Sequence, residues 1–395
     1  MRFGINNPSF LQSAGNAGSA NDYFYITSRA ASNQLSFSTG LLGVFAENVE
    51  YSVNSTENWV QLTRDTTITL NEQDTVYFRN HTGVVNNNGG TVLLEITDEF
   101  DAGGNIMKLF YPGQSAVPAN GFDRLFKELP IVSAGELKLT AKKIGKSAYE
   151  YMFNNCTSLT TAPELPATDL ADYCYNSMFL GCTGLTTAPE LPATVLADGC
   201  YLHMFLECTS LTTAPELIAT ILESQCYSEM FSGCTSLTTA PELPATDLAD
   251  SCYDSMFLGC TGLTTAPELP ATDLAYGCYS KMFSDCTGLT TAPELPATAL
   301  TDGCYSEMFS GCTSLTTAPE LIATILENHC YSEMFSGCTS LTTITCMATD
   351  ISANMCVSDW LYNVSESGTF TKSPGMNDWR IGDSGIPEGW TVIEQ

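Results

Sequence analysis

The sequence predicts a multidomain protein in which an N-terminal all-β sandwich is followed by an α/β solenoid of 26-residue units. Two observations lead to this expectation. Short runs of β-type composition fill most of the first hundred residues. After them, one phrase of sequence returns every 26 residues, with two cysteines in each copy. A fixed period of roughly 20 to 50 residues indicates stacked units that cannot bury their apolar faces alone.

The first part of the chain divides into a tail and a compact β-region. Residues 1–22 are rich in Gly, Asn, Ser and Ala, which predicts a flexible tail or an anchor. Residues 23–112 are expected to form the sandwich, which serves as an attachment domain. Its strands are predicted where β-type runs alternate with Asn, Gly, Asp and Thr clusters, at 23–26, 34–38, 49–53, 59–62, 67–70, 75–78 and 91–96.

The repeat region is predicted to span residues 113–366, with an N-terminal cap in its forerunner segment. "TTAPEL" occurs seven times, and an eighth, degenerate copy follows Leu341. "CTSLTTAPELIATILE" occurs at 208–223 and again at 312–327, four units later. This longer period indicates that a block of four units was duplicated, a history of lengthening an array. Residues 367–395 are predicted to form a C-terminal cap.

Each unit is expected to contain one short strand and one helix. "LTTAPEL" suits a strand, although Pro163 cannot donate a ladder hydrogen bond. The following segment places apolar residues four apart, which predicts a helix with one buried stripe. The core positions predicted in this unit are Leu170, Cys174, Met178, Phe179 and Cys182. A strand and a helix repeated in this way make a leucine-rich-repeat-like solenoid.

The repeat resembles a known family at these residues. "CYxxMFxxCTSLTT" is similar to the 26-residue repeat of bacterial surface proteins, related to BspA-like leucine-rich repeats, with the family core at Met178, Phe179, Cys182 and Leu185. The tail "GTFTKSPGMNDWRIGDSGIPEGWTV" (368–392) resembles the ending of many such arrays. The resemblance covers about 345 residues. It implies surface adhesins and recognition proteins of gut anaerobes, and related proteins of phages that infect them.

The start of the chain bears on where such a protein is found. "MRFGINNPSFLQSAGNAGSA" lacks a basic segment followed by an apolar core, so no secretory signal peptide is expected. No run of about 18 apolar residues occurs, so no transmembrane helix and no membrane insertion are expected. The expected location is a virion assembled in the host cytoplasm. The alternative is a bacterial cell surface reached by an unrecognised export route.

Charge is concentrated in the repeats. The whole chain has a formal net charge of −30. Between Ser147 and Thr371 there are 26 acidic residues and one basic residue, Lys281, which gives −25. Nucleic acid is therefore not an expected partner, because binding it requires Lys and Arg to replace counterions. A soluble acidic surface explains the charge, and cations or basic surfaces remain open as partners.

The cysteines are expected to be reduced groups that fill the core. Structural zinc sites prefer cysteines two to four residues apart, whereas the spacings here are 18 and 8. The position equivalent to Cys174 in the first unit is Ala148, which can replace a small buried group but not a metal ligand. Disulfides between neighbouring units stay open as an alternative, and metal is the less favoured one. No metal or other cofactor is predicted.

Two sets of residues are the candidates for facing a ligand. One is a column of carboxylates, one per unit, expected to point into solvent because like charges about 5 Å apart repel. Calcium bridging is the alternative for this column, and the Thr columns beside it are candidates for presenting hydroxyls to a sugar. The other set holds variable positions between the fixed ones. Together the candidates are Glu164, Glu190, Glu216, Glu242, Glu268, Glu294, Glu320, Asn176, Ser177, Leu202, His203, Ser280 and Lys281.

No enzyme signature is found. The three histidines lie at 81, 203 and 329, and no phosphate loop or HExxH motif occurs. Seven copies of one carboxylate do not make an acid and base pair. The expected function is that of a non-enzymatic structural and recognition protein of a phage virion, such as a head or tail fibre or a decoration protein. Its N-terminal region would contact other virion proteins, and its repeats would bind a bacterial surface glycan or protein. A bacterial surface adhesin is the alternative, an enzyme is a distant one, and homo-oligomers remain open.

Overall fold

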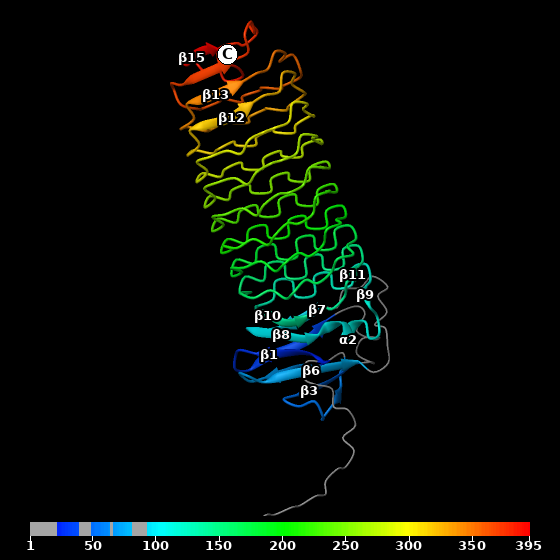
Figure 1. Cartoon of the computed structure of the whole chain (residues 1–395). Helices are drawn as coiled ribbons and strands as arrows, with labels where there is room; N and C mark the ends of the chain where they lie inside the picture. Colours follow the sequence, from blue (N-terminus) through cyan, green and yellow to red (C-terminus); the bar gives the residue numbers. More distant parts are fainter. Residues whose placement is uncertain (1–21, 39–48, 64–65, 81–92) are drawn as a thin grey trace, which may run out of the picture.

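A computed structural model describes residues 22–38, 49–63, 66–80 and 93–395. The chain forms an elongated molecule (Figure 1), with the N-terminal sheets at one end and the C-terminus at the other. Between them the backbone winds as a β-solenoid of about 11 turns at 26-residue spacing. The repeat period inferred from the sequence is therefore confirmed.

All seven strands predicted in the head are found. A six-stranded sheet has the order β10-β8-β1-β6-β3-β4, in which β10 is Ile131–Lys138, and a three-stranded antiparallel sheet has the order β5-β2-β7. Phe37 of the small sheet packs edge-on against Phe78 of the large one, with ring centroids 5.5 Å apart. The head strands are β1 (Phe24–Ser28), β2 (Asn33–Ser38), β3 (Val49–Val53), β4 (Val60–Gln61), β5 (Ile68–Leu70), β6 (Thr75–Asn80), β7 (Leu93–Ile96) and β8 (Phe100–Asn105).

The expected antiparallel sandwich is not what the head shows, because its large sheet also contains a strand from beyond the head. β10 (Ile131–Lys138) runs parallel to β8 and forms the outer strand of the six. Along the chain, β8 and β10 are connected by the short helix α2 (Ile106–Phe110) and by β9 (Ala116–Val117). β9 pairs in parallel with β11 (Lys143–Ile144). The first solenoid turn is therefore built directly on the head sheet. The boundary predicted between residues 112 and 113 lies within this connection.

The helix predicted in each repeat is wrong. Among the described residues only α2 is α-helical, and the segment from Cys174 to Cys182 consists of consecutive turns. The physical reason lies in the backbone of every fourth residue: Tyr173, Ser177 and Gly181 have φ values of 56°, 54° and 70°. A left-handed residue cannot continue a right-handed helix. The solenoid is thus built from strands and turns and is not of the α/β type.

Hydrogen bonds in these turns alternate between two directions. Cys200 N donates back to Ala197 O at 3.2 Å, which closes a turn within the unit. Tyr201 N donates to Cys226 O of the next unit at 3.1 Å. The same alternation continues along the segment and recurs in the other units. Each buried amide is thereby satisfied either locally or by the next turn, as buried backbone groups require.

The proline-containing segment of each repeat, opposite the turns just described, does not form the same regular hydrogen bonds to the next unit. Between Ala214 and Ile221 no backbone amide of the described chain donates to a backbone carbonyl. The last three strands of the chain contain no proline, and there the pairing is regular, since a residue other than proline can donate to the ladder; the strand before them, which keeps Pro319, pairs with a register shift at that residue. The resulting parallel sheet has the order β12-β13-β14-β15, formed by β12 (Thr317–Leu321), β13 (Thr343–Cys346), β14 (Thr369–Lys372) and β15 (Thr391–Glu394).

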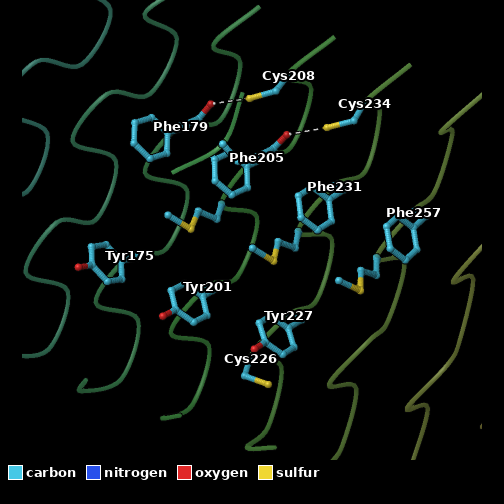
Figure 2. Close-up of a cluster of buried hydrophobic side chains, with 14 of the residues drawn as sticks. Tyr175, Phe179, Tyr201, Phe205, Cys208, Cys226, Tyr227, Phe231, Cys234 and Phe257 are labelled. Carbon is cyan, nitrogen blue, oxygen red and sulfur yellow. Dashed lines mark hydrogen bonds between the residues drawn. The ribbon is translucent and has the colours of Figure 1, made fainter. Parts of the chain in front are cut away.

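Stacked side chains fill the inside of the solenoid, as Figure 2 shows for four units. The tyrosines from Tyr149 to Tyr331 form one column with ring centroids 5.5–6.2 Å apart. The phenylalanines from Phe126 to Phe335 form a second, with spacings of 5.3–5.7 Å. The predicted core residues Cys174, Met178, Phe179 and Cys182 are buried, and Leu170 is half-buried against them.

Aromatic residues continue the stack at both ends. Phe122 lies on Tyr149 at 5.5 Å, in a turn that precedes the first recognisable repeat. At the other end Trp360 lies on Tyr331 at 6.4 Å, and Trp379 lies on Trp360 at 5.3 Å. These residues cover the last tyrosine on each side, which is what the terminal units of a stacked array must do.

Candidate ligand-binding faces

The predicted carboxylate column is fully on the surface. All seven glutamates from Glu164 to Glu320 are exposed. The first six lie in the proline-containing part of their turns, where neighbouring strands do not form a continuous sheet, and Glu320 lies in β12, which pairs with β13. The expectation that these side chains point outward is consistent with this placement.

Shallow grooves separate neighbouring turns along the same face. One of about 520 Å³ is lined by Glu216 and Glu242 together with Pro215, Pro241 and Ile218. The next, of about 440 Å³, shares Glu242 with it and adds Glu268. A third, of about 480 Å³, lies beside Glu164 at the start of the solenoid. Proline rings, aliphatic side chains and carboxylates are among the groups that line them.

The variable candidates lie on the turn side of the solenoid and are less exposed than the glutamates. Asn176 and Ser177 are buried, with Ser177 Oγ donating to Asn176 Oδ1 at 2.9 Å. Asn176 Nδ2 donates to Glu150 Oε1 of the preceding unit, also at 2.9 Å. Leu202 and Ser280 are half-buried. At these positions the side chains contact one another across turns.

Charged residues in one column of this side pair with the next unit. His203 Nε2 lies 3.3 Å from Glu229 Oε1, and this hydrogen bond is the main cause that lowers the pKa of Glu229. Lys281 Nζ lies 3.3 Å from Glu307 Oε1. Asp254, between them in the array, is half-buried, and this burial raises the pKa of its carboxyl. The few basic groups of the repeats are therefore placed to offset neighbouring acids.

All the cysteines except Cys346, which lies in β13, form two buried columns inside the turns. In one column each thiol donates to a phenylalanine carbonyl of the preceding turn, for example Cys208 Sγ to Phe179 O at 3.1 Å (Figure 2). Burial raises the pKa of the Cys156, Cys200 and Cys208 thiols to about 12. A protonated thiol is required for this donation, and a thiolate is the reactive form of cysteine. All 17 cysteines are present as free, buried thiols.

Thiol titration tests this description of the cysteines. In the folded protein an aromatic disulfide reagent should react with almost none of the 17, because the thiols are buried and protonated. After denaturation without reductant, close to all 17 should react. If only a few reacted in denaturant, the cysteines would be paired, and the description of two free-thiol columns would be wrong.

An acidic residue at the start of the solenoid predicts a pH effect on stability. Asp123 Oδ1 is buried and has no hydrogen-bond partner among the described residues, while Oδ2 accepts from Arg124 at 2.6 Å. Burial raises the pKa of this carboxyl to about 6, against a smaller lowering by Arg124. Because the folded pKa is above the unfolded one, of about 4, the stabilising contribution is complete below that pH and is lost as pH rises through about 6.

Asp123→Asn removes this titration and should therefore become relatively more stabilising as pH rises. Between pH 5 and 7.5 the difference in unfolding free energy between variant and parent should shift in favour of the variant by about 1 to 2 kcal/mol. Urea unfolding at the two pH values measures it. Repulsion among the other acidic residues changes the unfolding free energy of variant and parent equally, so it does not affect the difference between them. An unchanged difference at the two pH values would contradict the assignment.

Two further findings concern metal-binding groups and long apolar helices in the described residues. Within residues 22–38, 49–63, 66–80 and 93–395, no group of three or more His, Cys, Asp or Glu side chains is placed to hold a metal ion. No helix in that same part of the chain is long and apolar enough to cross a membrane. Comparisons with protein-family profiles, curated proteins and solved structures find no match to this chain.

Proposed function

We propose that this protein is a non-enzymatic structural and recognition component of a phage virion, such as a head or tail fibre or a decoration protein. Its head contacts other virion proteins, and its solenoid projects outward and binds a ligand on a bacterial surface. The observation that carries the proposal is the architecture: a non-repeated head joined through a shared sheet to a long stack of near-identical turns. The solenoid, called the shaft below, extends away from the head and presents the same surface many times along its length.

The cysteines support a virion component over an exported protein. A virion protein is assembled in a reducing cytoplasm, where thiols persist, whereas exported proteins meet oxidising conditions that favour disulfides. The 17 free thiols of the solenoid are consistent with assembly in a reducing cytoplasm. The resemblance of "CYxxMFxxCTSLTT" to repeats of gut anaerobes and their phages supports the same proposal.

A bacterial cell-surface adhesin is the second candidate, because the same resemblance includes such adhesins. Mass spectrometry of purified virions and of isolated bacterial envelopes separates the two. Peptides of this chain at a fixed ratio to the major capsid protein are expected in the virions. Peptides confined to the envelopes would favour the adhesin. Binding of the fluorescently labelled full chain to bacterial cells tests recognition itself, and absence of binding to every host tested would contradict it.

A further inference from the structure

A pocket at the C-terminal end of the solenoid differs from the grooves along its side. Its volume is about 390 Å³, within the range of pockets that hold small ligands. The last, degenerate repeat and the non-repeated C-terminal tail line it, whereas the grooves are lined mainly by proline-containing repeat segments. The end of the solenoid lies opposite the head in Figure 1. The lining residues are Asp350, Ile351, Ser352, Val357, Asp378, Arg380 and Ser384.

Arg380 is an exposed cation whose side chain has no ion pair or hydrogen bond with the described residues. Its backbone, in contrast, is held in place. Ile386 N donates to Arg380 O at 2.8 Å, and Gly382 N donates to Ile386 O at 2.9 Å. Gly385 is required in this loop, since a Cβ there would overlap the Arg380 carbonyl. A fixed backbone therefore presents a guanidinium with all five donors free.

Acceptors and a small apolar surface surround this guanidinium. Asp350 is exposed, and Ser352 N donates to its Oδ1 at 2.9 Å, which fixes the carboxylate in the loop. Asp378 is also exposed and has no hydrogen bond with the described residues. Ile351 and Val357 contribute the apolar part of the lining. The pocket thus combines unused donors, unused acceptors and an aliphatic wall.

We propose that this pocket, named here the tip pocket, binds a neutral saccharide through adjacent hydroxyl groups. A sugar hydroxyl donates and accepts at once, so a pair of them matches a carboxylate beside a guanidinium. The C–H face of a sugar ring matches the aliphatic wall. This inference rests on the proposed function, because it names the chemical class of ligand at the end of the projecting shaft.

Charge selects among saccharides. Two carboxylates and one guanidinium give the tip pocket a formal charge of −1, and the repeats beside it add further negative charge. An acidic sugar would meet like charges and would displace the guanidinium from its role as donor to hydroxyls. A neutral hexose avoids both effects. The preference for neutral over acidic sugars is therefore part of the proposal.

Titration of the full chain with single sugars tests the proposal. The probes are methyl mannoside, methyl galactoside and N-acetylglucosamine as neutral sugars, and glucuronic acid as the acidic one, followed by saturation-transfer NMR. At least one neutral sugar should bind in the millimolar range, more tightly than glucuronic acid. Arg380→Ala and Asp378→Ala should each weaken it by about tenfold, since each removes hydrogen bonds to a charged group.

Glu388→Ala provides the matched control, because Glu388 is exposed at the same end and does not line the tip pocket. It should leave sugar binding unchanged, and all three variants should keep the melting temperature of the parent. Should Arg380→Ala fail to fold, Arg380→Lys keeps the charge, removes the planar set of donors and should also weaken binding. No binding of any neutral sugar, tighter binding of glucuronic acid, or equal losses in Glu388→Ala would overturn the proposal.

A failure of the tip-pocket proposal can be distinguished from a failure of the proposed function. Sugar binding that depends on Arg380, without binding of the full chain to cells, would uphold the tip pocket and reject recognition of a bacterial surface. Cell binding that is unchanged in Arg380→Ala, with no sugar bound, would reject the tip pocket and direct attention to the glutamate face.

Discussion

Replacing Phe257 by alanine should lower the free energy of unfolding by about 3 to 5 kcal/mol, and Met256→Ala by about 2 to 5 kcal/mol. Both side chains are fully buried in the middle of the array. Phe257 lies between Phe231 and Phe283, with centroids 5.7 Å away on each side. The turns above and below cannot collapse into the space left, because their own backbones are hydrogen-bonded across it. Urea denaturation followed by circular dichroism measures both losses.

Glu268→Ala is the control for these variants. Glu268 belongs to the unit that follows and is exposed, so its removal should change the stability by no more than about 0.5 kcal/mol. Asp254 would be a poorer control because it is half-buried. Equal losses for Phe257→Ala and Glu268→Ala would show that the interior of the solenoid has been assigned to the wrong face.

The repeats could be predicted in their period and core but not in their backbone. Cys174, Met178 and Cys182 are four apart, and this spacing fits both an α-helix and a series of four-residue turns. The deciding feature is the column six residues before the start of each "TAP", where glycine recurs in many units, as at Gly181, Gly233 and Gly259. These residues have φ near 70°. Glycine at the same position of successive units was the available signal that a left-handed residue is required there.

The union of head and solenoid could not be read from the sequence. Strand β8 has the sequence "FDAGGN", whose glycines are typical of a turn rather than of a strand. Gly103 and Gly104 are required there because Tyr25 and the Tyr23 carbonyl lie against them. Phe122 and Phe126 occupy the positions of Tyr149 and Phe153 one turn earlier, but the sequence around them has diverged from the repeat. Parallel pairing between distant segments leaves no local pattern.

The candidate sites also divide into residues whose position the sequence could predict and residues whose position it could not. The outward glutamates follow from a repeated charge that cannot be buried, so the sequence was sufficient to predict their exposure. The burial of Asn176 and Ser177 depends on the turn geometry and could not be seen without it. The tip pocket brings Asp350 of the last, degenerate repeat to Asp378 and Arg380 of the non-repeated tail, and no spacing in the sequence indicates that these segments meet.

A fragment of residues 113–395 should be markedly less soluble and less heat-stable than the whole chain. The cut falls between Pro112 and Gly113, so it removes β8, against which β10 pairs in parallel. The fragment would expose the open edge of β10, a template for pairing with other chains. It would also expose Phe126, whose ring lies 6.4 Å from Phe24 and from Phe100 of the head.

A nick at the same place separates loss of chain connection from loss of packing. A protease site inserted between residues 112 and 113, cleaved after folding, should leave both pieces in one complex on size-exclusion chromatography, with a melting temperature close to that of the intact chain. The part of Phe126 that the head covers contributes about 1 to 2 kcal/mol to holding them together, since its other face lies on Phe153, and the paired strands add to it. If the pieces separated and 113–395 remained monomeric with unchanged melting, head and solenoid would be independent domains. The head would then be only an attachment module, whereas a stable nicked complex would make it the terminal cap of the solenoid as well.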